Sequence, residues 1–150
     1  MTDRASLIGS ADPAFEMAIE RGKIREFARA CMSTNPAYLE GRHPVIPPTF
    51  LATSAFWSTT TGQGAGDKLG LDNKRVLHGG QDIVFHGPPP HAGDELTSQT
   101  RIADVYEKEG KRGGTMTFVE IVQELRNADG TLVAEVRNTI IETGKAPEAS

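Results

Sequence analysis

The sequence predicts an α+β fold in which one long helix packs against an antiparallel β-sheet. Apolar residues at helical spacing form a single narrow stripe between Ile24 and Cys31, the pattern of a helix that lies on one surface. The second half of the chain instead alternates apolar and polar residues between short turns, as strands do. Because 150 residues suffice for one packed core, we expect a single domain over residues 1–150 with loose termini at 1–13 and 145–150.

Composition argues against several classes of protein. The sequence has no apolar run of about 18 residues, so it predicts no membrane span, and its first residues lack the pattern of a secretory signal. The one cysteine, Cys31, rules out an internal disulfide and a cysteine-based zinc cluster. A net charge of −4 without a Lys/Arg stripe argues against nucleic acid as a partner. We therefore expect a cytoplasmic protein that binds neither a membrane nor nucleic acid.

The first half of the chain carries the helical signals, after one short strand at 15–19. The main helix is expected over 21–32 and ends before Pro36, because a residue that precedes proline disfavours the α conformation. Pro47 then introduces a short second helix over 49–58, since proline is favoured where a helix begins. The narrow apolar stripe of the main helix predicts that this helix lies on a sheet.

The second half of the chain predicts four strands. They cover residues 76–85, 95–106, 115–126 and 132–140. Apolar residues on both faces of 115–126 indicate a central strand, and Gly130 suits the tight hairpin turn that follows it. In the last strand, alternation places Leu132, Ala134, Val136 and Ile140 inward and Glu135, Arg137 and Thr139 outward. A sheet of about five strands leaves an exposed edge, which dimerisation commonly covers.

Several apparent motifs in the sequence are weak. Residues 62–68 look like a phosphate-binding loop but lack its spacing, so we expect a flexible loop over 59–72. The histidines are His43, His78, His86 and His91, and no pair has the helical spacing of a zinc site. Cys31 is expected to be buried and unreactive on the apolar stripe. We therefore predict no metal, and the absence of a G-x-S-x-G element disfavours a serine hydrolase.

The segment that bears most on function runs from Phe27 to Phe50 and reads FARACMSTNPAYLEGRHPVIPPTF. It joins the end of the main helix, an Asn-Pro turn, an aromatic residue and a Pro-Pro-Thr-Phe entry into the second helix. One interpretation is structural: a helix stop followed by a loop. The other is functional: this segment forms the wall of a substrate channel at the end of the helix.

Several pieces of the sequence, in their order and spacing, resemble the MaoC-like family of hot-dog hydratases and dehydratases. The pieces are Ile24–Ala30, Asn35–Tyr38, Pro47–Phe50, the pair Val76–Gln81 and His91–Leu96, and the hairpin Asp129–Glu135. The chain is most similar to the N-terminal dehydratase domain related to that of type I fatty-acid synthase, found in accessory subunits of two-subunit (3R)-hydroxyacyl-ACP dehydratases. The resemblance spans about residues 15–143 and implies a hot-dog fold, a long central helix wrapped by an antiparallel sheet of about five strands.

The catalytic members of that family carry a G-D-x-N-P-x-H element whose Asp and His form the catalytic dyad. Aligned on Asn35 and Pro36, this chain has Ser33 in place of the Asp and Tyr38 in place of the His. Ser33 cannot serve as a carboxylate base, and a tyrosine with an ordinary pKa of about 10 is a poor one. The link from Leu39 to Val45 is also shorter than in the relatives. The resemblance therefore implies a chain without the catalytic dyad.

Accessory subunits of this kind pair with a catalytic subunit and help to hold the acyl chain. The resemblance thus implies a subunit of a (3R)-specific enoyl-thioester hydratase or 3-hydroxyacyl-thioester dehydratase, which binds acyl-CoA or acyl-ACP while a partner supplies the Asp and His. It implies these substrate-binding residues: Asn35, Tyr38, Pro47, Thr49, Phe50, His78 and Gln81. Each of them has a structural alternative, and Asn35 with Pro36 in particular suits a helix-stop turn. No cofactor is expected, because adding water to an activated double bond needs neither metal nor nucleotide.

The sequence leaves two alternatives open. The chain alone can be a hydratase in which His43 or Glu40 replaces the dyad, or it can be a homodimer that binds acyl-CoA without a reaction. A thioesterase is disfavoured because Glu26 lies on the charged face of the helix. One chain does not distinguish a homodimer from a heterodimer.

Overall fold

The protein folds around one five-stranded antiparallel sheet with few helices, as expected for the α+β class. The computed structural model describes residues 3–58, 68–110 and 114–144. The strands are β1 (Phe15–Ala18), β2 (Val76–Phe85), β3 (Glu95–Glu109), β4 (Thr115–Arg126) and β5 (Leu132–Glu142), in the order β1-β3-β4-β5-β2. The helices are α1 (Arg21–Ala30) and α2 (Pro36–Leu39), with two 3₁₀ helices, η1 (Arg4–Leu7) and η2 (Phe50–Trp57).

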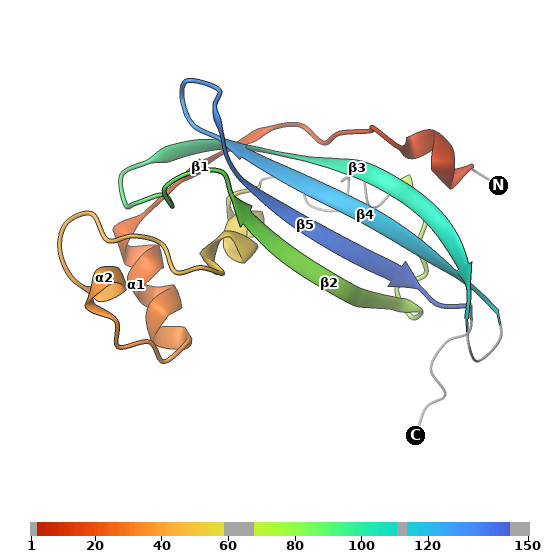
Figure 1. The fold of residues 1–150 in the computed structure, drawn as a ribbon, viewed down its shortest axis with the longest axis horizontal. Coiled ribbons are helices and arrows are strands. Elements are labelled where there is room, and N and C mark those ends of the chain that lie inside the picture. Colours follow the sequence, from red (N-terminus) through yellow and green to blue (C-terminus); the bar gives the residue numbers. More distant parts are fainter. Residues whose placement is uncertain (1–2, 59–67, 111–113, 145–150) are drawn as a thin grey trace.

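The helices are not spread evenly over the sheet. Figure 1 places α1 and α2 at one end of the molecule, η1 and the end of β5 at the other, and η2 behind the sheet. Ile24 of α1 and Phe50 of η2 share a buried cluster with Leu125 of β4. We call the sheet face that carries this cluster the inner face and the opposite one the outer face.

The strands of the second half follow the predicted pattern closely. Strands β2 and β4 have the predicted bounds, and β3 continues three residues beyond the predicted end, to Glu109. The turn before β5 closes through a hydrogen bond from the Gly130 N–H to the Asn127 oxygen, with Gly130 at a φ of 79°. The predicted inward residues Ala134 and Val136 are buried in the core. The alternation of apolar and polar residues therefore predicted the strands of the second half correctly.

The main helix is shorter than predicted. It begins at Arg21 as expected but ends at Ala30, and Met32 adopts a positive φ of 56°, which a right-handed helix cannot contain. Cys31 consequently closes the helix as an exposed residue, so the expectation that its thiol is buried is wrong. The second helix lies where it was predicted, but η2 has 3₁₀ geometry.

The end of the inner face beyond α1 is covered by the N-terminal segment and by residues after 67. Leu7, Leu69 and Leu71 pack there around a second buried cluster that contains Ile102 and Val119. Residues 9–12 also run along β3, with hydrogen bonds from the Gly9 N–H to Ile102 and from the Ile102 N–H to Ser10. The expected loose lead-in at 1–13 thus has defined contacts from Asp3 onward, while residues 145–150 lie outside the described residues.

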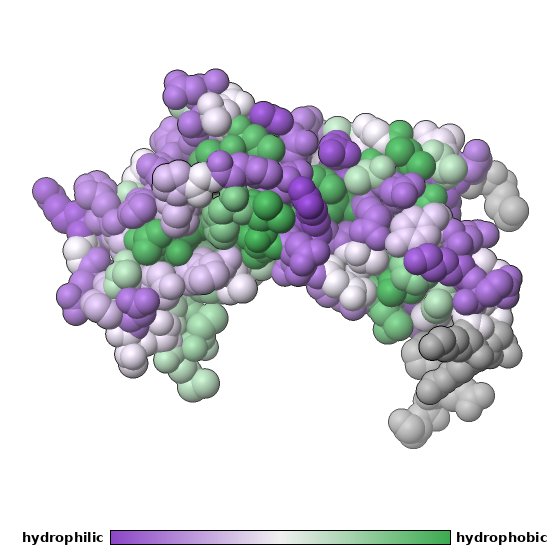
Figure 2. All heavy atoms as spheres, viewed as in Figure 1, coloured by the Kyte–Doolittle hydropathy of each residue, from purple (hydrophilic) through white to green (hydrophobic). Residues whose placement is uncertain are grey.

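The outer face is mixed in character. Arg101 and Arg126 both lie near the Glu124 carboxylate on it. Farther along the same face, the Tyr106 and Phe118 rings stack at 5.1 Å between centroids. Figure 2, which views this side, shows apolar surface near the start of β2 and the end of β5. One end of the outer face is therefore partly apolar.

Candidate functional site

Asn35 and Pro36, on which this chain aligns with the catalytic element of its relatives, form the start of α2. The Asn35 side-chain oxygen accepts a hydrogen bond from the Ala37 N–H at 3.0 Å, and Pro36 occupies the first helical turn. Arg25 of α1 donates to the Leu39 oxygen at 2.8 Å and so holds α2 against α1. The Asn35 side chain therefore acts as a helix cap in this structure.

Ser33 and Tyr38, which the sequence resemblance aligns with the family's dyad, also have structural contacts. The Ser33 hydroxyl accepts a hydrogen bond from the Asn35 N–H at 3.3 Å, so it continues the turn between α1 and α2. Tyr38 is partly buried and packs against the core cluster around Phe50. Neither side chain supplies a carboxylate or an imidazole here.

The Pro-Pro-Thr-Phe element divides between core and surface. Pro47 and Phe50 are buried, with Phe50 only 1% exposed, whereas Thr49 is exposed. The Phe50 N–H donates to the Pro47 oxygen at 3.0 Å, which starts η2. Phe50 is thus a core residue that anchors η2, and Thr49 is free to meet solvent.

His78 and Gln81 lie together on β2, away from α2 (Figure 1). The Gln81 amide donates to the Asn138 side-chain oxygen at 2.8 Å, and the His78 Nε2 atom lies 3.4 Å from the same oxygen. Asn138 was not among the residues predicted from the sequence. It could have been found, because it follows Val136 two positions later on the inward-facing side of β5. The structure therefore brings His78 and Gln81 together but separates them from Asn35 and Tyr38.

A small apolar hollow, which we call the aromatic crevice, lies between α1 and η2. It has a volume of about 170 Å³ and is lined by Lys23, Glu26, Phe27, Ala30, Phe50, Thr53, Phe56 and Trp57. The Phe50 ring makes edge contacts with the Phe27 ring at 5.6 Å and the Trp57 ring at 6.1 Å. Phe56 is 83% exposed at the rim. Such a hollow can take an apolar group, with the charged Lys23 and Glu26 at its side.

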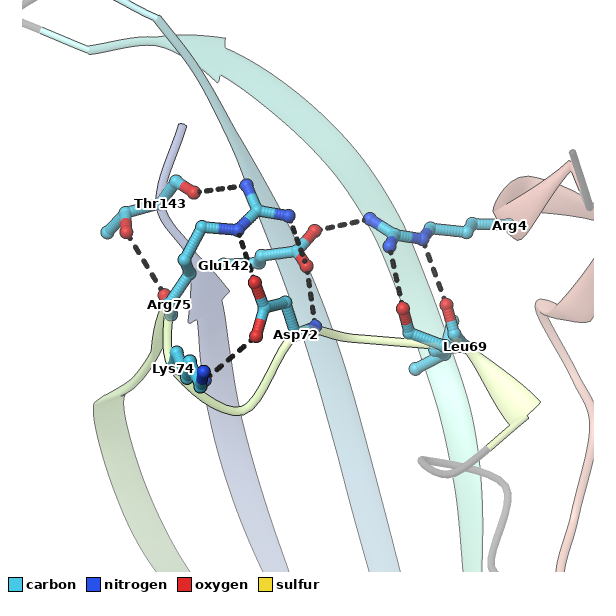
Figure 3. A network of polar contacts seen from close by, with 8 residues as sticks. Arg4, Leu69, Asp72, Lys74, Arg75, Glu142 and Thr143 are labelled. Atoms are coloured by element: carbon cyan, nitrogen blue, oxygen red, sulfur yellow. Dashed lines mark hydrogen bonds and ion pairs between the residues drawn. The ribbon is translucent and has the colours of Figure 1, made fainter. Parts of the chain in front are cut away.

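A larger cleft of about 880 Å³ lies at the opposite end, beside Arg4, Arg75 and Glu142. Figure 3 shows that the Glu142 carboxylate joins these arginines, with Arg4 Nη1 at 2.6 Å and Arg75 Nη2 at 3.1 Å. Every nitrogen of both guanidinium groups donates to a protein oxygen, the others being on Leu69, Gly70, Asp72 and Thr143. We call this set the ionic clasp. Because every guanidinium nitrogen already donates to a protein oxygen, the clasp holds the N-terminal segment and the segment before β2 against the end of β5.

The electrostatics of the ionic clasp favour the charged form of its carboxylates. Burial alone raises the pKa of Glu142, but the Asp72 N–H and the nearby Arg4 and Arg75 together bring that pKa below its ordinary value. The Lys74 N–H and then the Arg75 side chain lower the pKa of Asp72 in the same way. The clasp is therefore fully ionised at neutral pH.

Of the two residues considered as replacements for the dyad, His43 has a structural contact. His43 Nδ1 lies 2.9 Å from the Ala92 oxygen and ties the loop after α2 to the segment before β3. His86 Nε2 pairs with Glu135 at 2.7 Å, and Arg137 and then His86 lower the pKa of that carboxyl. Glu40 and His43 line neither the aromatic crevice nor the cleft of the clasp. Neither the contact of His43 with Ala92 nor the pair of His86 with Glu135 lies at the aromatic crevice.

A third cleft is lined by several titratable side chains, among them His86, Asp94, Glu95 and Asp129. The cleft, of about 640 Å³, lies between the Pro-rich loop at 86–96 and the hairpin at 127–133. In the parts of the chain that the structure describes, no three His, Cys, Asp or Glu side chains gather as a metal site. Residues 62–67 of the apparent phosphate loop lie outside those parts. No helix in them is both long and apolar enough to cross a membrane.

The fold is that of the hot-dog dehydratases. The chain superposes on a MaoC-like dehydratase with a TM-score of 0.74 at 18% identity, covering 93% of this chain and 43% of that one. It superposes on a chain of the ChsH1–ChsH2 complex of Mycobacterium tuberculosis with a TM-score of 0.73 at 18% identity, covering 98% and 92%. A chain of the HadBC (3R-hydroxyacyl-ACP dehydratase) complex of the same organism is 26% identical, with a TM-score of 0.65 over 86% and 94%.

Sequence comparison narrows this class to one family. Residues 6–136 match the FAS1-like dehydratase domain region, and the chain belongs to that family. A UPF0336 protein of Streptomyces coelicolor is 38% identical over 115 residues, 70% of this chain and 75% of that protein. A UPF0336 protein of Saccharopolyspora erythraea is 29% identical over 143 residues, 91% and 86%. The resemblance drawn from the sequence is therefore confirmed.

Proposed function

We propose that this chain is a subunit of a (3R)-specific enoyl-thioester hydratase or 3-hydroxyacyl-thioester dehydratase, and that a second hot-dog subunit supplies the catalytic Asp and His. The proposal depends mainly on the structural roles of Ser33 and Tyr38. They occupy the positions of the family's dyad, yet one holds a turn and the other packs against the core. Water addition to an enoyl thioester needs a general base with a suitable pKa, which these residues do not offer.

The edge of the sheet at β2 is the proposed seat of the catalytic subunit. Strand β2 has ten residues and ends the sheet, and no strand within the described ranges pairs with its outer side. A long open edge invites pairing with another chain. Leu77 on this strand is 50% exposed, and His78 and Gln81 are exposed as well. The HadBC and ChsH1–ChsH2 neighbours are two-protein complexes, which supports a heterodimer here.

The aromatic crevice is the proposed seat of the acyl chain of acyl-CoA or acyl-ACP. Its lining is mainly apolar, and the Phe50 ring contacts both the Phe27 ring and the Trp57 ring within it. Each methylene removed from water by such a lining contributes about 0.8 kcal/mol to binding. The larger cleft at the ionic clasp has a more polar lining, which includes Arg4, Arg75 and Glu142, and every guanidinium nitrogen there donates to a protein oxygen.

Rebuilding the dyad tests the proposal. The double variant Ser33→Asp/Tyr38→His restores both family groups on the same scaffold, and we expect it to hydrate a medium-chain trans-2-enoyl-CoA. The wild-type chain and each single variant are the matched controls, and we expect them to be inactive. Loss of the conjugated thioester absorbance measures the reaction. Turnover by the wild-type chain alone would contradict the proposal and point to a stand-alone enzyme.

A further inference from the structure

Three buried polar side chains form a chain of hydrogen bonds across the inner face. The Ser54 hydroxyl of η2 donates to the Gln123 side-chain oxygen at 2.9 Å, and the Gln123 amide donates to the Ser98 hydroxyl at 2.7 Å. Their exposed fractions are 5%, 8% and 0% for Ser54, Gln123 and Ser98. We call this set the polar relay. It links η2 to β4 and β3.

The polar relay sits in apolar surroundings. Gln123 pairs in the sheet with Val136, and Ser98 pairs with Leu125, both of which are core residues. A buried amide or hydroxyl without a partner costs free energy, and in this set both serine hydroxyls are paired with the Gln123 amide group. Hydrogen bonds of this kind are directional, which apolar contacts are not. The polar relay therefore fixes a position and does more than fill space.

The element that the polar relay holds is intrinsically weak. Helix η2 has 3₁₀ geometry, whose hydrogen bonds are poorer than those of an α-helix. Its other anchors are the buried side chains of Phe50 and Leu51 near its start. Ser54 lies in the middle of η2 and is its buried polar anchor. Without it, the second half of η2 has only Trp57 packed against the core.

That second half forms one side of the aromatic crevice. Thr53, Phe56 and Trp57 line the crevice, and Ser54 stands between the first two in sequence. The floor of the crevice is Phe50, which begins the same helix. Because η2 supplies both this side and the floor of the crevice, the position of η2 sets the space that is open to an apolar tail.

We propose that Gln123 is a specificity-determining positioning residue, which holds η2 through the polar relay and so limits the length of the acyl tail that the aromatic crevice accepts. This inference rests on the proposed function, because it requires that acyl chains bind in the crevice. Gln123 itself does not line the crevice and acts through Ser54.

Binding of a series of straight-chain acyl-CoA esters of increasing length tests the inference. Trp57 is the only tryptophan of the chain and lines the crevice, so its fluorescence reports binding. Wild-type affinity rises by about fourfold per methylene and then reaches a plateau when the tail fills the crevice. In Gln123→Met, which keeps the side-chain length but not the amide, the plateau moves to longer tails. Beyond the wild-type plateau, the variant gains about fourfold for each further methylene that it buries.

Milder variants keep the test valid if Gln123→Met folds poorly. Ser98→Ala removes one end of the polar relay, and Ser54→Ala removes the other, and both shift the plateau in the same direction. Gln99→Met makes the same chemical change on an exposed residue of β3 and leaves the plateau in place. Thermal melting confirms which variants are folded.

The outcomes separate the two proposals. If folded relay variants keep the wild-type plateau, the role of Gln123 is overturned while the acyl site stands. If wild-type affinity does not depend on tail length at all, the acyl-binding function itself is overturned, and the role of Gln123 falls with it.

Discussion

The two ends of the molecule each hold a cleft, and the larger cleft is the poorer candidate for a ligand. The cleft at the ionic clasp has about five times the volume of the aromatic crevice, 880 against 170 Å³. Its guanidinium nitrogens, however, all donate to protein oxygens. The aromatic crevice instead presents apolar side chains, of which Phe56 is largely exposed. Whether the lining groups are already hydrogen-bonded to the protein, more than the volume of the cleft, distinguishes a structural contact from a binding site.

The largest expected effect is at the floor of the aromatic crevice. Phe50→Ala removes a fully buried ring that contacts Phe27 and Trp57, so we expect the free energy of unfolding to fall by about 4 kcal/mol. Urea denaturation monitored by circular dichroism measures it. A loss below about 1 kcal/mol would show that Phe50 is not a core anchor of this end.

At the other end, Glu142→Gln breaks the ionic clasp. The substitution keeps the size of the side chain but leaves two guanidinium groups without their shared charge, at a cost of about 3 kcal/mol in unfolding free energy. Glu124→Gln is the matched control, because that carboxylate is paired with arginines on the outer face, and we expect it to cost less than about 1 kcal/mol. Equal losses of unfolding free energy in the two variants would show that burial of Glu142 does not make the ionic clasp more stabilising than an exposed ion pair. Acyl-CoA affinity should be unchanged in both.

Acid should weaken the ionic clasp specifically. The folded pKa values of Glu142 and Asp72 lie below their ordinary values, so their contribution to stability is complete above the unfolded pKa and is lost as the pH falls through the folded pKa. We expect the melting temperature to fall as the pH decreases below about 5. The fall should be smaller in Glu142→Gln, since the variant no longer binds that proton. Parallel pH profiles for the two proteins would contradict this assignment.

A smaller effect distinguishes a helix cap from a substrate ligand at Asn35. Asn35→Ala removes the hydrogen bond to the Ala37 N–H and should lower the free energy of unfolding by about 1 kcal/mol. Asn35→Asp keeps a capping oxygen and should restore stability. If both variants instead keep full stability but lose acyl-CoA affinity, Asn35 binds substrate and its capping role is minor.

The smallest stability effect should accompany a clear loss of binding. Phe56→Ala truncates an exposed ring, so the free energy of unfolding should change by less than about 0.5 kcal/mol. Because the ring forms the rim of the aromatic crevice, the affinity for long-chain acyl-CoA should fall, as measured through Trp57 fluorescence. Unchanged affinity would show that the acyl chain does not bind in this crevice.

The alternation of apolar and polar residues, together with residues that end helices and strands, predicted most of the fold. The bounds of β2 and β4 were predicted correctly because period-two patterns and flanking turns mark strand ends. The end of α1 was missed because Met32, a residue without a turn signal, adopts a positive φ. The 3₁₀ geometry of η2 was missed as well, since a short apolar segment does not reveal which helix type packing selects.

The polar features of the structure were the hardest to predict. The ionic clasp joins Arg4 to Glu142 across 138 positions of sequence, and no local pattern relates them. The polar relay was missed because serine and glutamine inside strands or helices are normally read as surface residues. The assignment of Ser33 and Tyr38 came from the family resemblance alone, since nothing in their own spacing marks a site.

The most direct test of the central claim is hydration of a medium-chain trans-2-enoyl-CoA by this chain alone and by this chain mixed with a hot-dog subunit that carries the Asp and His dyad. Loss of the conjugated thioester absorbance gives the rate. The account predicts no turnover by the pure chain and turnover in the mixture, above that of the partner alone. Turnover by the pure chain at the rate of the mixture would contradict it, because the catalytic groups would then have to lie within this chain.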